Sequence, residues 1–138
     1  MHLRKAQLHE LDTIYTMGFD VWGDGLTLDD YLAGCRNSEK YLSGTWYVLV
    51  EKDRVVSSLI VYRDMFGLAK GCFGIGSVAT PLEPRHQGYA SELINLVKTE
   101  LFTRHTCKAL YLYSDIEHQF YNRLGFVGIV GPLAVNCY

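Results

Sequence analysis

The sequence predicts a mixed α+β domain, with a central sheet of about six to seven mostly antiparallel strands and helices on both faces. Two observations predict it. Two runs rich in β-branched and aromatic residues, 45–51 and 55–62, have the pattern of a hairpin. A strand, an amphipathic helix and a second strand then follow at residues 72–79, 88–103 and 108–113. A crossover of this kind places its two strands parallel, so the sheet is expected to be mixed.

The size and composition of the chain limit its class. It has 138 residues, 49% hydrophobic and 20% charged, so we expect one globular domain over residues 1–138. A net charge of −2 argues against a nucleic-acid or membrane partner, and the apolar runs are too short to span a bilayer. The four cysteines have neither the spacing of a zinc site nor that of a disulfide framework. We therefore expect no metal and a cytoplasmic location.

The first third of the chain is expected to be mainly helical. A short strand at residues 3–8 leads into a helix at 9–19. Residues 20–25, rich in Gly and Asp, form the predicted loop that follows. Thr27 is a favourable N-cap for a second helix, which should end near residues 37–38.

Local composition also predicts the remaining connections and the elements of the C-terminal part. Residues 52–54 form the hairpin turn and residues 63–70 a loop. A short helix is expected at 116–124, and a last pair of strands at 126–130 and 133–135.

The rest of the chain is organised around the segment that joins strand 72–79 to helix 88–103. The helix has one apolar stripe, formed by Ala90, Leu93, Ile94, Val97 and Leu101. Gly88 and Ala90 are small where a ligand would approach the main chain. Free backbone N–H groups at a helix N-terminus favour a phosphate or pyrophosphate. From residue types alone, an ordinary strand–loop–helix connection explains the segment about equally well.

Two motifs resemble those of a known family. Arg85-His86-Gln87-Gly88-Tyr89-Ala90 is similar to the R/Q-x-x-G-x-G/A signature of the GNAT superfamily of N-acetyltransferases. Ser77-Val78-Ala79-Thr80-Pro81 precedes it, as that family's fourth strand does. Residues 120–126, with the sequence FYNRLGF, resemble the family's later LYEKLGF box. The motifs occur in the family's order, and the element order matches over nearly the whole chain, which implies a GNAT-like fold.

The resemblance implies acetyl-CoA as cofactor and an amine as acetyl acceptor. Val78 and Ala79 would offer main-chain groups to the pantetheine arm, residues 85–90 would surround the pyrophosphate, and Ser91 could add a hydroxyl. Tyr121 falls on the tyrosine that faces the CoA sulfur, where it would donate a proton to the leaving thiolate. The implied cofactor-binding residues are Val78, Ala79, Arg85, His86, Gln87, Gly88, Tyr89, Ala90, Ser91 and Ser114.

The sequence also departs from the family pattern. His86 and Gln87 stand where Gly and a basic residue are common, and Ser114 stands where Asn is common. Strand 72–79 has no acidic residue, so a general base must come from elsewhere or act through water. These departures leave open a catalytically silent CoA-binding or interaction module of the same fold.

The acceptor side is expected near the loop at residues 20–25. Asp20, Trp22, Asp24 and Tyr31 could hold a cationic amine by charge and by cation–π contact. The alternative is a solvated acidic loop in which Trp22 packs as a hydrophobic staple. The predicted function is therefore that of an acyltransferase, an N-acetyltransferase that acts by direct attack in a ternary complex. Its acceptor would be a small-molecule amine or a lysine side chain. A homodimer is left open, through pairing of residues 131–138 at a sheet edge.

Overall fold

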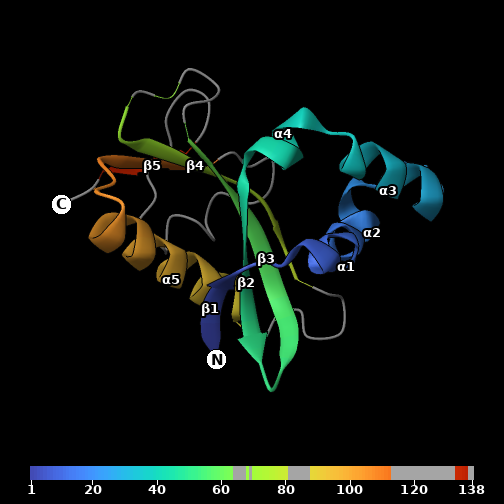
Figure 1. Cartoon of the computed structure of the whole chain (residues 1–138), viewed down its shortest axis with the longest axis horizontal. Coiled ribbons are helices and arrows are strands. Elements are labelled where there is room, and N and C mark those ends of the chain that lie inside the picture. Colours follow the sequence, from blue (N-terminus) through green and yellow to red (C-terminus); the bar gives the residue numbers. More distant parts are fainter. Residues whose placement is uncertain (64–67, 69, 81–87, 113–132, 137–138) are drawn as a thin grey trace.

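The computed structural model describes residues 1–63, 68, 70–80, 88–112 and 133–136. Within them, one sheet has six strands in the order β1-β2-β3-β4-β5-β6 (Figure 1). Only β4 and β5 pair in parallel, and the other four neighbouring pairs are antiparallel. The strands are β1 (His2–Lys5), β2 (Thr45–Glu51), β3 (Arg54–Arg63), β4 (Cys72–Ala79), β5 (Ala109–Leu112) and β6 (Leu133–Asn136). The predicted mixed α+β class and the parallel crossover are confirmed.

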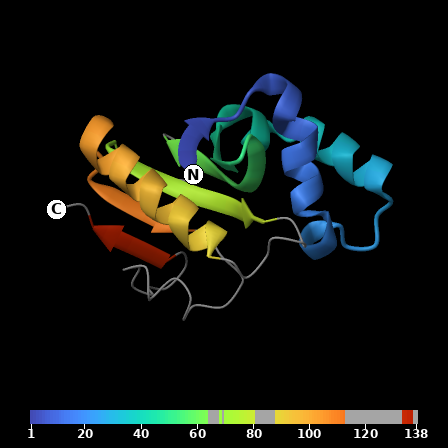
Figure 2. The same ribbon diagram turned by 90° about the horizontal axis from the view of Figure 1, so that it is seen from below.

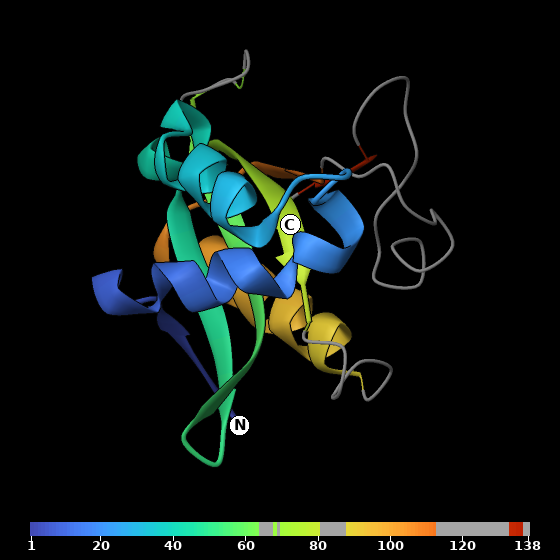
Figure 3. The same ribbon diagram turned by 90° about the vertical axis from the view of Figure 1, so that its right-hand side faces the viewer.

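Helices cover the two sides of the sheet unequally. In Figure 1, α5 lies on one side of the strands and α1–α4 lie on the other. Figure 2 shows α5 running along the sheet, and Figure 3 shows α1 crossing the β2–β3 hairpin on the opposite face. The helices are η1 (Leu8–Glu10, a 3-10 turn), α1 (Leu11–Met17), α2 (Phe19–Trp22), α3 (Leu28–Arg36), α4 (Glu39–Ser43) and α5 (Tyr89–Arg104).

Each side of the sheet has its own hydrophobic core. The stripe of α5 packs on one face, where Leu93, Ile94 and Val97 are fully buried against strand residues such as Leu49 and Leu59. Fully burying one such aliphatic side chain contributes about 1.5–3 kcal/mol, so the stripe holds α5 on the sheet. The second core packs helices α1 and α3 on the opposite face. It includes Ile14, Tyr15, Met17, Tyr31, Cys35, Trp46, Val48, Ile60 and Tyr62.

The single helix predicted at residues 9–19 is wrong. The segment is divided into η1, α1 and α2, and Gly18 ends α1 and precedes α2. The ring of Trp22 packs directly on Gly18, because a Cβ there would lie only 2.2 Å from a ring carbon. Residues 20–22, predicted as loop, are therefore helical, and the chain turns only after Gly23.

The sequence also gave no indication of α4. This helix begins after Ser38, whose hydroxyl accepts a hydrogen bond of 3.3 Å from the amide of Tyr41. The predicted first strand ends earlier than expected, at Lys5, and Leu8 belongs to η1. Strands 45–51 and 72–79 have the predicted bounds, and α5 starts one residue after Gly88. The helix and strand predicted at 116–124 and 126–130 lie outside the described residues.

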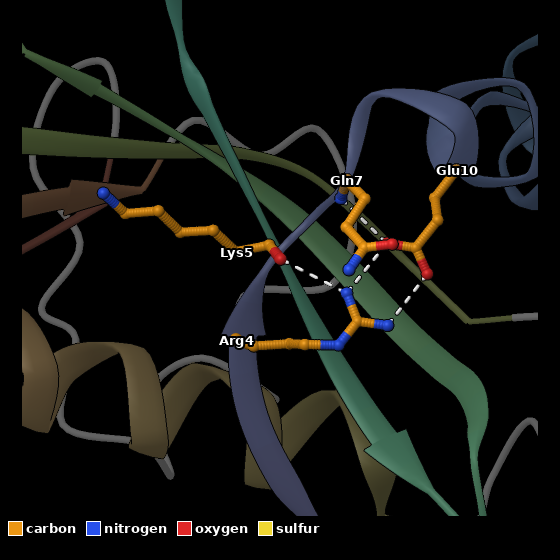
Figure 4. Close-up of polar contacts among 4 residues, drawn as sticks. All are labelled: Arg4, Lys5, Gln7 and Glu10. Atoms are coloured by element: carbon orange, nitrogen blue, oxygen red, sulfur yellow. Dashed lines mark hydrogen bonds and ion pairs between the residues drawn. The ribbon is translucent and has the colours of Figure 1, made fainter.

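A network of hydrogen bonds joins β1 to η1 (Figure 4). The Arg4 guanidinium donates two hydrogen bonds to the Glu10 carboxylate, at 2.8 and 2.9 Å, and a longer one of 3.3 Å to the Lys5 carbonyl. The same carboxylate accepts a 2.8 Å bond from the Gln7 amide. The hydrogen bonds from Arg4 lower the pKa of Glu10 to about 2, so this carboxylate is ionised at neutral pH.

Candidate functional site

The strand before the signature contains a β-bulge. In the pairing of β3 with β4, Ser58 is opposite Ala79 and Ile60 is opposite Gly76. Two residues of β4, Ser77 and Val78, therefore face a single residue of β3. Ser77 has a φ of +47°, in the left-handed region that a residue with a side chain rarely adopts. Such a conformation costs on the order of 1–3 kcal/mol and persists only where neighbouring groups hold it.

The bulge lies where the sequence predicted the approach of a cofactor arm. The described ladder between β4 and β5 runs from Cys72 to Ile75 on β4. Val78 and Ala79, the predicted contacts of the arm, lie beyond the last described pair. A bulge disrupts the ladder locally, re-aims the strand and leaves its extra residue unpaired. The bulge therefore separates the described β4–β5 ladder from the segment at Val78 and Ala79.

Hydrogen bonds hold the bulge from two sides. The Tyr41 hydroxyl on α4 lies 3.0 Å from the Ser77 hydroxyl. On β3, the fully buried Ser57 donates a 2.9 Å bond to the Ala79 carbonyl. The Ser57 oxygen also lies 3.1 Å from the Thr80 hydroxyl. Side chains from other elements therefore hold both the strained Ser77 and the residues after it, Ala79 and Thr80.

The N-terminus of α5 supplies the second part of the site. Gly88 is the N-cap, is exposed, and has a φ of +79°. A Cβ built at this position would meet no atom within 4 Å, so packing does not require glycine here. The left-handed backbone does favour it. The amides of the first turn of a helix lack intrahelical acceptors, so those of Tyr89, Ala90 and Ser91 suit an anion.

A hydrogen bond fixes this first turn to the sheet. The Tyr89 hydroxyl donates a 2.6 Å bond to the Glu51 carboxylate at the end of β2. This bond to Glu51 is the main reason that the pKa of the Tyr89 phenol is raised. The predicted role of Tyr89 uses only its main chain, and its side chain has a separate structural task.

Several predicted site residues cannot be placed. Arg85, His86 and Gln87 of the signature, together with Ser114 and Tyr121, lie outside the described residues. Their predicted roles stay predictions.

Two of the four predicted acceptor residues, Trp22 and Tyr31, lie against Gly18. Trp22 packs on Gly18, and the hydroxyl of Tyr31 lies 3.3 Å from a Cβ built there. Tyr31 is buried against Phe19, with ring centroids 5.3 Å apart, and burial is the main cause of its raised pKa. The charge of Asp20 also contributes to raising that pKa. Asp24 is exposed in the next turn, with a φ of +47°.

Sequence reasoning missed an aromatic cluster formed by Tyr15, Tyr41 and Trp46. Tyr15 and Tyr41 are stacked with centroids 5.7 Å apart. Trp46 presents its edge to both rings, at 5.8 and 5.1 Å. Its buried indole N–H has no hydrogen-bond partner among the described residues. Only the aromatic content of residues 41–47 could have pointed to this cluster, since α4 was not predicted.

The described part of the chain has neither a candidate metal site nor a membrane-spanning helix. No group of three or more His, Cys, Asp and Glu side chains there could hold a metal ion. None of its helices has the length and apolar character needed to cross a membrane. Among the described residues, Cys35, Cys72 and Cys107 form no disulfide, and burial raises the pKa of Cys35.

Comparisons with solved structures show the same fold. An acetyltransferase from Brucella melitensis, solved with acetyl-CoA, has 16% sequence identity and a TM-score of 0.73, and the match covers 98% of this chain and 86% of that one. The PaiA N-acetyltransferase from Thermoplasma acidophilum, solved with coenzyme A, has 10% identity and a TM-score of 0.69, with 98% of each chain covered. A chimera of the spermidine N-acetyltransferase SpeG from Vibrio cholerae and hSSAT has 13% identity and a TM-score of 0.75, and the match covers 99% of this chain and 96% of that one.

A search of the curated proteins finds no match. The profile of the acetyltransferase (GNAT) family, in contrast, matches residues 8–126, which include both sequence motifs and the described bulge. A match over this much of the sequence agrees with the fold and with the site geometry. The chain belongs to the GNAT family of acetyltransferases.

Proposed function

We propose that the protein is an N-acetyltransferase that moves the acetyl group of acetyl-CoA to a primary amine by direct attack in a ternary complex. The bulge at Ser77–Val78 carries the proposal, because it interrupts the β3–β4 ladder just before the segment that leads to the α5 N-terminus, where main-chain groups would meet the thioester. Acetyl-CoA supplies an already activated thioester. The protein has only to bind it, align the amine and stabilise developing charge.

The described residues fit this cosubstrate. Gly88 leaves its main chain open, and the amides of the next residues point along the axis of a 16-residue helix. That arrangement suits a pyrophosphate, with Ser91 able to add a hydroxyl. Val78 and Ala79 would take the pantetheine arm through main-chain groups. Arg85, His86 and Gln87 would complete the pyrophosphate site, and Ser114 would contact the arm.

The chemistry follows from these positions. A neutral amine forms a bond to the carbonyl carbon while the carbon–sulfur bond breaks. A backbone N–H of Val78 or Ala79 would stabilise the negative charge on the carbonyl oxygen. Tyr121 would protonate the departing thiolate, and the amine proton would leave through water or a base outside β4. No covalent intermediate on the enzyme is needed.

The acceptor is a small-molecule amine or a lysine side chain. Asp20 would offer charge to a cation, and Trp22, which lies with Tyr31 against Gly18, would offer an aromatic face. Asp24 adds a second carboxylate in the exposed turn. A spermidine acetyltransferase chimera among the structural neighbours supports amines of this type as test substrates. We also propose that residues 1–138 act as one cytoplasmic domain without a nucleic-acid partner, and that residues 131–138 are the place to test for a homodimer.

One experiment tests the function. Acetyl-CoA is mixed with spermidine, free lysine or a lysine-containing peptide. Free thiol is followed by a colorimetric assay and the acetylated amine by mass spectrometry. Amine-dependent thiol release with an acetylated product supports the proposal. Binding of acetyl-CoA without thiol release indicates a silent CoA-binding module. The absence of any thermal shift at millimolar acetyl-CoA, with folded protein, contradicts the cosubstrate.

A further inference from the structure

We propose that Tyr41 is a positioning residue for acetyl transfer, which holds the β4 bulge through its hydrogen bond to Ser77 and so places the main chain of Val78 and Ala79 against the thioester. This inference rests on the proposed function. Tyr41 belongs to α4, and it lies 36 residues before Ser77 in the sequence, well away from both motifs along the chain.

The backbone of Ser77 is strained. Its left-handed φ of +47° is unusual because the residue is not glycine, although Gly76 is next to it. A strained backbone persists when surrounding groups determine it. Among the described residues, the Ser77 side chain bonds to Tyr41, at 3.0 Å. Ser57 holds Ala79 and Thr80 after the bulge, whereas Tyr41 acts on the strained residue itself.

Other residues hold Tyr41 in place. Its ring stacks on Tyr15 and meets the edge of Trp46, so the phenol is fixed in direction. Its amide is held by the Ser38 hydroxyl at the start of α4. Burial is the main cause that raises the pKa of the phenol above its ordinary value of 10. The group therefore stays a neutral hydroxyl at neutral pH and keeps its bond to Ser77.

A hydrogen-bond donor to the oxyanion must lie where the negative charge develops. If the backbone N–H is displaced, its hydrogen bond weakens more in the transition state than in the bound substrate. Loss of the Tyr41 hydroxyl should therefore lower kcat and hardly change the KM for acetyl-CoA. The net stabilisation from one hydrogen bond changes an equilibrium population by about fivefold. If loss of the Tyr41 hydroxyl lowers the population of the native bulge by this factor, kcat should fall about fivefold.

The test uses Tyr41→Phe, Ser77→Ala, the double variant, and a matched control, Tyr15→Phe. The control removes a hydroxyl from the ring stacked on Tyr41, in the same core, without touching Ser77. Kinetics use the best amine of the panel above. The amide chemical shifts of Val78 and Ala79, recorded by NMR without ligand, report on the bulge independently of activity.

We expect Tyr41→Phe and Ser77→Ala to lower kcat alike, the double variant to add little, and Tyr15→Phe to stay within about twofold of wild type. In a Ser77→Gly background, glycine adopts the left-handed conformation without help, so Tyr41→Phe should lose most of its effect. Both single variants should move the Val78 and Ala79 amide signals.

Two results would overturn the inference. Unchanged amide signals and unchanged kcat in Tyr41→Phe would show that the bulge does not depend on it. An equal loss in Tyr15→Phe would assign the effect to core packing. If wild type acetylates no amine, the proposed function fails, while the amide signals still decide separately whether Tyr41 holds the bulge.

Discussion

Gly88 offers a direct test of the pyrophosphate site, because the structure supplies a matched control. Gly88 and Gly25 are both exposed, with φ values of +79° and +80°. Among the described residues, a Cβ at either position would meet no atom within 4 Å. Valine at either site therefore brings a similar backbone strain. Only Gly88 stands at the N-terminus of α5, where the pyrophosphate is proposed to approach.

The expected magnitudes follow from this symmetry. A side chain in the left-handed region costs about 1–2 kcal/mol, or roughly 3–8 °C in Tm for a domain of this size, and the cost should be similar in both variants. The affinity for acetyl-CoA should fall at least about tenfold in Gly88→Val, a loss of about 1.4 kcal/mol, because the new side chain blocks the main chain. Gly25→Val should bind as wild type does.

The assay is isothermal titration of acetyl-CoA into each variant, with thermal unfolding as the folding control. Gly88→Asn is a useful third variant, since asparagine tolerates the left-handed conformation and adds bulk with less strain. It should also lose affinity. Wild-type affinity in a folded Gly88→Val, or equal losses in the Gly88 and Gly25 variants, would remove the main chain at Gly88 from the cofactor site.

Three further predictions concern the proton donor, the acceptor side and acid stability. Tyr121→Phe should lower kcat by about 10²-fold with little change in acetyl-CoA affinity, and a kcat within about twofold of wild type in steady-state kinetics would leave Tyr121 as packing. Replacing Asp20 and Asp24 together by Asn should raise the KM for the amine and spare that for acetyl-CoA; an unchanged amine KM returns these residues to the solvated surface. The depressed pKa of Glu10, from 4.5 to about 2, contributes stability that is present above pH 4.5 and lost as the pH falls toward about 2. Glu10→Gln should cost about 1 kcal/mol at pH 7 and flatten that loss, as measured by urea unfolding at pH 7 and pH 3; an unchanged pH dependence would contradict the pairing with Arg4.

The parts of the fold predicted from sequence are those in which one local pattern determines the outcome. The stripe of α5 repeats at helical spacing from Ala90 to Leu101, and its members Leu93, Ile94 and Val97 are all buried as expected. Strand β4 was likewise bounded by its own residues. In α5, the residues whose spacing predicts the helix are also the residues that pack on the sheet and stabilise it. The prediction therefore depends little on distant residues.

The helix α3 begins after Thr27 and ends before Asn37 as predicted, but the helices at residues 8–22 and 39–43 were predicted poorly because their limits depend on tertiary contacts. The apolar spacing of residues 9–19 continues through Gly18, but the ring of Trp22 packs on that glycine. The helix therefore ends there, and a second one follows. The five residues of α4 are too few for a periodic signal, and the helix depends on its Ser38 cap and on the packing of Tyr41. Short helices of this kind have little stability of their own.

The same distinction divides the candidate site. The role of Gly88 could be proposed from six consecutive residues, because a left-handed N-cap is a local requirement that glycine meets. The bulge could not, since nothing in Ser77-Val78-Ala79 announces that Ser77 rather than Gly76 takes the positive φ. That choice depends on the register with β3 and on a hydroxyl 36 residues away in the sequence. If the proposed function holds, the geometry of the thioester site is therefore determined partly by α4, and substitutions there should change turnover even when both motifs are intact.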